Sequence, residues 1–289
     1  MSICNLCPRN CNAVRNEREG KGFCRSASTL KIAKAALHFG EEPFISGKNG
    51  SGTIFFSGCS LGCVFCQNAV ISQENHGKEV STKRLSEIFK ELEALGAENI
   101  NFVTPTHYID KIEKALEIYR PSIPLILNSS GYESLSTIKK DIFDVYLFDL
   151  KFFSSEKSLK YAACKDYFDV ASSCIKTAVE IKGKPLFNND LIKSGVVVRH
   201  LLLPQGTVEA INIIDWLDNN APEIIFSLMS QYVPMNKANE FKELNRKITK
   251  REYDKVCEFV FDKKFYDIYI QSLKSSTTEY LPEFDLSGV

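Results

Sequence analysis

The sequence predicts an α/β fold in which parallel strands alternate with helices. Short apolar segments of strand-like composition recur after residue 50, segments with helical spacing of apolar residues separate them, and the pair repeats about six times. Parallel strands joined by right-handed crossovers form either a doubly wound sheet or an incomplete barrel, and both fit this alternation. The 289 residues suffice for one such unit with a small appendage.

Charge and hydropathy argue against several classes of protein. Lys+Arg and Asp+Glu are equal at 36 each, so no overall positive field favours nucleic acid or an anionic membrane surface. No run of about 18 apolar residues occurs, and the first residues lack the basic and apolar regions of a signal peptide. We therefore expect a cytoplasmic protein that binds neither nucleic acid nor membrane.

The chain contains 10 cysteines, most of which fall in two tight clusters. In a reducing compartment such clusters indicate metal sites rather than disulfides. The scattered cysteines are expected to be small buried hydrophobic residues; they are Cys164, Cys174 and Cys257.

The N-terminal cluster has the spacing CxxCPxxCx12C and consists of Cys4, Cys7, Cys11 and Cys24. Its segment contains too few apolar residues to fold alone, so we expect a bound metal to hold it. Tetrahedral zinc and a closed 4Fe–4S cluster that feeds electrons to a second site both fit four thiolates. Four protein ligands leave no open position, so we do not expect substrate to react here.

A loop rich in proline and glycine follows, between residues 39 and 52. His38 directly precedes this loop, and the pair Glu41 and Glu42 lies within it. We expect these three to be surface and hinge residues that link the cysteine-rich segment to the main domain.

The second cluster follows an apolar run at residues 53–56 and has the spacing CxxxCxxC: Cys59, Cys63 and Cys66. Three thiolates therefore project from one loop just past a strand end. A 4Fe–4S cluster held by three cysteines keeps one iron free for an exogenous ligand. The alternative is a structural zinc site, which needs a fourth ligand, and His76 is the nearest candidate in a polar segment.

The regular elements begin at Ser81, the expected N-cap of a helix that Gly96 ends. Strands are predicted at residues 100–103, 125–128, 145–149, 196–203 and 224–229. Helices are predicted between them at 109–119, 135–140, 168–181 and 208–217. A helix after residue 250 and a short strand at 266–270 complete the chain.

In both candidate architectures ligands bind beyond the carboxyl ends of the strands, so the polar residues there are candidates for a site. Asp149 and Lys151 alternate and should lie on one face of their strand. Arg199 and His200 interrupt an apolar strand, and burying them is costly unless they face a polar cavity or a partner.

The chain resembles the radical S-adenosylmethionine (SAM) superfamily, and within it a group related to the pyruvate formate-lyase activating enzymes. The resemblance runs from Cys4 to about Pro234. It rests on the motifs CxLCPRxC, EEPxISG, GSGTIFFSGC, CxFCQN, VTPTH, SGYE, DLK, VRHLLLP and SLMSQYxP. It implies a partial (β/α)6 barrel (residues 51–235), a Cys-rich N-terminal cap (1–50) and a C-terminal extension (236–289).

The resemblance also implies roles for the cysteines and their neighbours. Cys59, Cys63 and Cys66 would hold a 4Fe–4S cluster whose open iron chelates the amino and carboxylate groups of SAM. Phe65 would lie near the adenine. Thr106 lies in Pro-Thr-His, where many members have Gly-Gly-Glu, so the ammonium contact would pass to Thr106 or to backbone carbonyls.

The remaining cofactor contacts implied by the resemblance come from the later strands. Asn128 would hydrogen-bond the ribose hydroxyls. Asp149 and Lys151 match a SAM-contacting pair, and Lys151 suits the methionine carboxylate or a substrate anion. Arg199, His200 and Gln231 complete the candidate set at this rim.

The expected function is reductive cleavage of SAM to a 5′-deoxyadenosyl radical that abstracts hydrogen from a substrate under anaerobic conditions. An electron donor such as flavodoxin or ferredoxin would supply the electron. The substrate would be a protein with a glycyl-radical site or, alternatively, another peptide or a small molecule. A non-catalytic iron–sulfur or zinc protein is the alternative outside the enzyme class.

Overall fold

The computed structural model describes residues 2–276 and 282–289 and is built around one ten-stranded sheet. Neighbouring strands along the sheet are paired in parallel from β4 to β12. In that order they are β4 (Ser51–Phe56), β6 (Ile100–Val103), β7 (Leu125–Ser129), β8 (Val145–Asp149), β10 (Leu191–Leu201), β11 (Ile225–Met229) and β12 (Asp267–Ile270). The predicted α/β fold with a parallel sheet, a partial barrel, is confirmed.

Antiparallel strands extend the sheet at its β4 end and flank β10. β3 (Leu30–His38) pairs with β4 and with β5 (Lys78–Val80), and β9 (Leu186–Asn188) forms a hairpin with β10. Outside this sheet, β1 (Ser2–Ile3) pairs with β2 (Val14–Arg15). Because β3 belongs to the main sheet, the sheet begins within the segment 1–50 that was expected to form only the cap.

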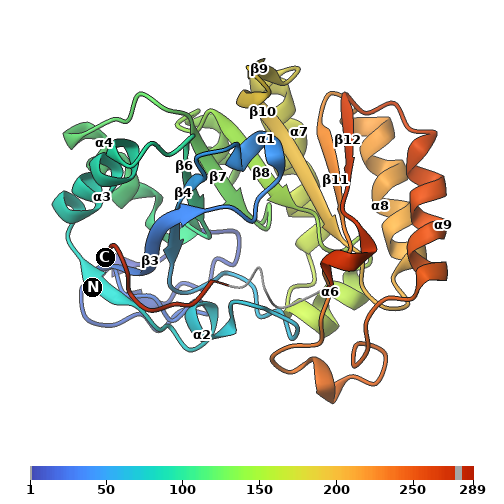
Figure 1. Cartoon of the computed structure of the whole chain (residues 1–289). Coiled ribbons are helices and arrows are strands. Elements are labelled where there is room, and N and C mark those ends of the chain that lie inside the picture. Colours follow the sequence, from blue (N-terminus) through green and yellow to red (C-terminus); the bar gives the residue numbers. More distant parts are fainter. Residues whose placement is uncertain (1, 277–281) are drawn as a thin grey trace.

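Helices follow the strands and cover the outer face of the sheet (Figure 1). They are α3 (Thr82–Ala94), α4 (Ile109–Ile118), α5 (Leu135–Lys139), α6 (Ser155–Ala162), α7 (Tyr167–Lys182), α8 (Thr207–Asn220) and α9 (Lys250–Phe261). The predicted cap is present, since Ser81 Oγ accepts a hydrogen bond from Arg84 N at 3.0 Å. Helix α6 was not predicted.

Short elements complete the chain: α1 (Pro43–Ser46), α2 (Ala69–Ser72), and the 3-10 turns η1 (Thr106–Tyr108), η2 (Ala238–Glu240) and η3 (Leu273–Ser275). The β9–β10 hairpin turns at Asn189 and Asp190, both with positive φ, 48° and 66°. This turn starts β10 five residues earlier than predicted. None of the helices in the described ranges combines the length and apolar composition needed to cross a bilayer.

The inner face of the sheet changes from apolar to polar along each strand. Ile126, Leu147, Val197 and Ile225 form one buried cluster with Ile45 of α1, which packs against this face. Strand residues two positions apart share a face, so Asn128, Asp149, Arg199 and Ser227 lie above the apolar cluster toward the strand ends. The α1 segment thus closes the bottom of the barrel and leaves a polar layer facing its mouth.

The tail from residue 282 returns to the opposite edge of the sheet. Leu286 N donates to Ala33 O at 3.1 Å, and Ala35 N donates to Ser287 O at 3.0 Å, so the tail pairs with β3. Phe284 packs edge-on against Phe55 with ring centroids 5.5 Å apart. The segment therefore lies beside the mouth of the barrel (Figure 1).

Candidate active site

The loop that follows β4 carries the three cysteines of the second cluster into a cavity of about 460 Å³. Backbone hydrogen bonds fix this loop to the end of α6: Gly62 N donates to Ala162 O at 3.1 Å and Val64 N donates to Tyr161 O at 2.8 Å. Cys59, Cys63 and Cys66 all line the cavity. The barrel itself thus presents three thiols to one space.

Gly58 allows the loop to pass close to the N-terminal segment. Its φ is +87°, and a Cβ at this position would lie 2.0 Å from Ser26 Oγ and 2.8 Å from Cys24 O. Only glycine tolerates both the conformation and the approach.

Most of the predicted cofactor contacts line the same cavity. They are Phe65, Thr106, Asn128, Asp149, Lys151, Arg199 and Gln231. The ends of five different strands and the cysteine loop after β4 are therefore brought together, as the strand-end rule requires. Gln231 Oε1 accepts a hydrogen bond from Gln271 Nε2 at 2.8 Å, so its amide is held in place.

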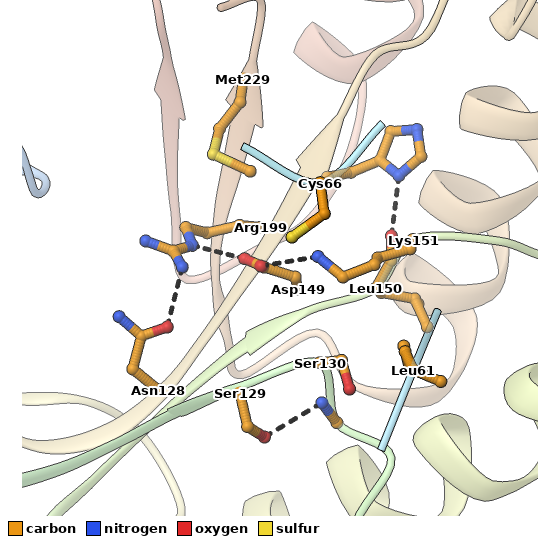
Figure 2. Close-up of polar contacts among 12 residues, drawn as sticks. Leu61, Cys66, Asn128, Ser129, Ser130, Asp149, Leu150, Lys151, Arg199 and Met229 are labelled. Atoms are coloured by element: carbon orange, nitrogen blue, oxygen red, sulfur yellow. Dashed lines mark hydrogen bonds and ion pairs between the residues drawn. The ribbon is translucent and has the colours of Figure 1, made fainter. Parts of the chain in front are cut away.

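A chain of ion pairs crosses the cavity wall. Lys151 Nζ lies 2.8 Å from Asp149 Oδ2, and Arg199 Nε lies 2.7 Å from Asp149 Oδ1. Arg199 Nη2 also donates to Asn128 Oδ1 at 2.9 Å. Figure 2 shows these contacts running from Asn128 through Arg199 and Asp149 to Lys151.

This network keeps its members charged despite burial. Burial alone would raise the pKa of Asp149, but Arg199 and Lys151 outweigh it and hold the pKa at about 2. Burial would likewise lower the pKa of Lys151, yet Asp149 opposes it and the pKa is raised. Lys151 therefore presents a permanent positive charge beside the cysteine loop.

Glu41 and Glu42 belong to the cavity, which corrects the expectation that they are surface and hinge residues. Glu41 Oε2 lies 2.7 Å from Arg199 Nη1, and Glu42 Oε1 accepts a hydrogen bond from Ser227 Oγ at 2.7 Å. The pair reaches this position because β3 runs antiparallel to β4 and α1 docks inside the barrel. Sequence periodicity contains no signal for such a return. His38, the third residue of that expectation, also lines the cavity.

His200 lies outside the cavity, contrary to the expectation that it contacts the cofactor. Successive strand residues face opposite sides, so Arg199 points into the barrel and His200 points toward the helices. His200 Nδ1 lies 2.8 Å from Leu150 O, and the residue lines a separate small cavity of about 90 Å³.

Thr106 is tied to a carboxyl group that sequence reasoning missed. Its hydroxyl donates to Glu133 Oε1 at 2.6 Å, and Glu133 is fully buried. Burial raises the pKa of Glu133 to about 7, although its hydrogen bonds oppose the shift. The motif SGYE contained this residue, but nothing in the motif showed that its side chain turns toward η1.

His107, the neighbour of Thr106, packs between the cysteine loop and the N-terminal segment. Its Nε2 lies 2.7 Å from Ser57 O, and its carbonyl accepts from Arg15 Nη2 at 2.6 Å. Burial lowers the pKa of His107 to about 3, so the ring is neutral at physiological pH. The packing is a structural contact between the two regions.

The thiols of Cys59 and Cys63 are protonated on their own, and a metal cluster would have to displace their protons to bind them as thiolates. Burial raises the pKa of Cys59 to about 12 and raises the pKa of Cys63 further, while Lys151 opposes both shifts. Three soft sulfur donors on one loop suit an iron–sulfur cluster. Within residues 2–276 and 282–289, no three His, Cys, Asp or Glu side chains converge closely enough for a single metal ion.

The four N-terminal cysteines line a second, much smaller space of about 20 Å³. Arg9 fixes this segment to the barrel, since its Nε donates to Ser60 O at 2.7 Å and its guanidinium lies 3.7 Å from the Phe23 ring centroid. Ser60 and Thr106 also line this space, and Thr106 lines the large cavity as well. The two cysteine sites therefore share a wall.

The isolated cysteines take no part in either site. Cys164 and Cys174 are buried, as predicted, and Cys257 is partly buried against the same core. Tyr232 packs near Phe65, with ring centroids 6.1 Å apart.

Comparison with known proteins supports the same chemistry. The family model described as the radical SAM superfamily matches residues 53–217. An uncharacterized protein of Methanocaldococcus jannaschii is 33% identical over 268 residues, which cover 88% of this chain and 73% of that protein.

Solved structures share the fold at low identity. SuiB of Streptococcus suis bound to S-adenosylmethionine has a TM-score of 0.53 at 12% identity, over 77% of this chain and 50% of SuiB. SuiB bound to its precursor peptide SuiA has a TM-score of 0.52 at 13% identity, over 74% of this chain and 47% of SuiB. TYW1 with a lysine–pyruvate adduct bound gives 0.51 at 14% identity, over 78% of each chain. This chain spans about half the length of SuiB.

The superfamily match covers more than half of the sequence and contains the whole cysteine loop. We conclude that this protein belongs to the radical SAM superfamily.

Proposed function

We propose that this protein is an enzyme that binds a 4Fe–4S cluster at Cys59, Cys63 and Cys66 and cleaves SAM reductively. The observation that carries the proposal is the meeting of three thiols and a charged strand-end network in one cavity. When bound, the cluster supplies the electron that converts SAM to methionine and a 5′-deoxyadenosyl radical. The radical then takes a hydrogen atom from the substrate.

The residues of the cavity would bind and orient SAM. Lys151 offers a fixed positive charge to the methionine carboxylate, because Asp149 holds its ammonium. Asn128 donates one amide hydrogen to Glu41 Oε1 at 3.1 Å and accepts from Arg199, which leaves a second hydrogen for a ribose hydroxyl. Phe65 is buried on the cavity wall, where it would pack against the adenine.

We also propose that Cys4, Cys7, Cys11 and Cys24 hold a second metal, either zinc or a closed 4Fe–4S cluster. The chemistry of a four-thiolate donor set supports both, and a single zinc ion would require the four sulfurs to lie closer together than they do in the described chain. The shared wall at Thr106 favours a cluster, since electrons could then pass from this site to the active site over a short distance. Iron, sulfide and zinc analysis after anaerobic reconstitution decides between about four and about eight irons per chain.

The substrate is proposed to be a protein with a glycyl-radical site, in keeping with the resemblance of the sequence to a group related to the pyruvate formate-lyase activating enzymes. Another peptide or a small molecule is the alternative, and SuiB, with the same fold, binds a precursor peptide. Fold kinship alone does not fix a substrate. The proposed electron donor is flavodoxin or ferredoxin. The division into a cap (1–50), a barrel (51–235) and an extension (236–289) is kept as a proposal, with β3 shared between the first two.

The test is anaerobic turnover of SAM by the reconstituted, dithionite-reduced protein. We expect 5′-deoxyadenosine, measured by chromatography, from the wild type and none from Cys63→Ala. Cys174→Ala is the matched control, because Cys174 is fully buried away from both cysteine sites. Absence of 5′-deoxyadenosine from a wild type with a full complement of iron and sulfide would exclude the proposed activity.

A further inference from the structure

The cavity has one carboxylate more than it has basic side chains. Among the residues that the structure describes, its acidic and basic side chains are three carboxylates and two cations: Glu41, Glu42, Asp149, Lys151 and Arg199. His38 lines the cavity as well and lies at the end of β3. The balance of the buried charges is therefore negative before any ligand binds.

The excess carboxylate is Glu42. Asp149 contacts both cations, and Glu41 contacts Arg199 and accepts from Asn101 Nδ2 at 3.0 Å. Among the described residues, the Ser227 hydroxyl donates to Glu42 Oε1, and Glu42 Oε2 forms a longer ion pair with Arg199 Nη1 at 3.8 Å. This arrangement leaves one carboxylate oxygen without a donor.

The unpartnered oxygen is buried. Glu42 is 7% exposed, and no group in the described part of the chain donates a hydrogen bond to its Oε2. Asn101 Oδ1, on the amide that contacts Glu41, also lacks a donor there. A buried carboxylate oxygen without a hydrogen bond is costly, and burial raises the pKa of Glu42 although Arg199 opposes the shift. Within the described ranges, Glu42 Oε2 and Asn101 Oδ1 each lack a hydrogen-bond donor. A positively charged donor would suit the Glu42 carboxylate best.

Glu42 lies on the far side of Arg199 from the cysteine loop. Lys151, which interacts with the thiol of Cys63, is followed by Asp149 and Arg199 before Glu42 is reached. Glu42 contacts Ser227 of β11 at the bottom of the polar layer. A ligand group at Glu42 is thus separated from the Lys151 end of the cavity by two ion pairs.

We propose that Glu42 binds a positively charged group of the substrate, an ammonium or guanidinium, at the floor of the cavity. The proposal deepens the proposed function and rests on it, since it assigns the substrate class of the same cavity. An ammonium carries hydrogen-bond donors only and one positive charge, which matches a lone buried carboxylate. Binding would balance the charge of the floor.

The test compares two probes that differ in one charge. Nα-acetyl-lysine amide carries an ammonium at the end of its side chain, and Nα-acetyl-norleucine amide lacks it. Binding of each to the reconstituted protein with SAM present is measured by ligand-observed NMR. We expect the wild type to bind the lysine probe at least about tenfold more tightly. Equal affinities in the wild type would overturn the proposal.

Variants locate the preference. Glu42→Gln should abolish the tighter binding of the lysine probe, whereas Glu117→Gln, on the exposed face of α4, should retain it. Ser227→Ala removes a hydrogen bond but no charge and should keep most of the preference, which provides a test even if Glu42→Gln does not fold. A preference that survives in a folded Glu42→Gln would overturn the assignment of the site.

The proposed function fails separately from this inference. SAM cleavage by the wild type without any probe tests the enzyme class alone, because it needs no substrate. Normal SAM cleavage with no preference for the lysine probe would overturn only the proposal that Glu42 binds a positively charged group. Loss of SAM affinity in Glu42→Gln with the probe preference intact would assign the carboxylate to SAM instead and would also overturn the inference.

Discussion

The two cysteine segments differ in what gives them their shape. The loop at residues 59–66 is tied by backbone hydrogen bonds to α6, and Lys237 N donates to Val64 O at 2.8 Å from the opposite side. The segment at residues 4–24 has one short strand pair and is fixed to the barrel by Arg9 and Arg15. Barrel packing therefore preorganises the three-cysteine site, whereas the four-cysteine site depends on its own ligands.

The largest expected difference between the segments is in turnover. Cys66→Ala should lower 5′-deoxyadenosine formation by about a hundredfold or more, because its thiol is one of the three proposed cluster ligands. Cys11→Ala should leave cleavage with dithionite measurable, since a chemical reductant does not need the N-terminal site. Equal losses in the two variants would show that the segments act as one site.

The contact between the segments can be tested at Gly58. Gly58→Ala should lower the free energy of unfolding by about 1–3 kcal/mol more than Gly96→Ala does. The control has a similar φ, +84° against +87°, but no atom lies within 4 Å of its added Cβ. Chemical denaturation measures the free energy of unfolding of both variants. Equal losses of stability would mean that the N-terminal segment does not pack tightly against the cysteine loop.

Lys151 tests whether the preorganised site binds SAM through charge. Lys151→Met should weaken SAM binding by about tenfold, because the methionine carboxylate loses its cation. Lys114→Met, exposed on α4, is the control of equal charge change. Isothermal titration of the reconstituted proteins gives both dissociation constants, and an unchanged value for Lys151→Met would remove this residue from the cofactor site.

A pH dependence of stability is expected at His107, which lies between the segments. The folded-state pKa of about 3 lies below the ordinary 6.5, so the unfolded chain binds more protons in that interval. Stability should therefore fall as the pH is lowered from about 6.5 toward 3, by at most about 1.4 kcal/mol per pH unit. Denaturation of His107→Asn should show a shallower slope than the exposed control His76→Asn. Equal slopes would exclude His107 as the cause.

Local periodicity predicted the parallel sheet and most of its strands, because each βα unit carries its own apolar pattern and stop signals. Val145–Asp149 and Ile100–Val103 have the predicted bounds. β3 escaped prediction because its partners, β4 and β5, are set by long-range pairing rather than by local pattern. For the same reason nothing local could bring Glu41 and Glu42 into the barrel.

The choice between Arg199 and His200 shows a second limit. Alternation along the strand requires one of the two side chains to face the barrel interior but does not say which one. The answer depends on the register of β10 with β8, in which Arg199 lies opposite Asp149. The grouping of the three cysteines could be predicted without any strand register, because their spacing alone keeps them in one loop.

The arrangement of a polar layer above an apolar layer inside the barrel has a consequence for how the protein can evolve. The side chains of the polar layer, which face the cavity, sit one pleat above the apolar residues that hold the strands together, as Arg199 sits above Val197 and Ser227 above Ile225. Exchanging the upper residue alters what is recognised while the lower one preserves foldability. Descendants of such a barrel can therefore acquire new reactants through few substitutions, without rebuilding their hydrophobic support.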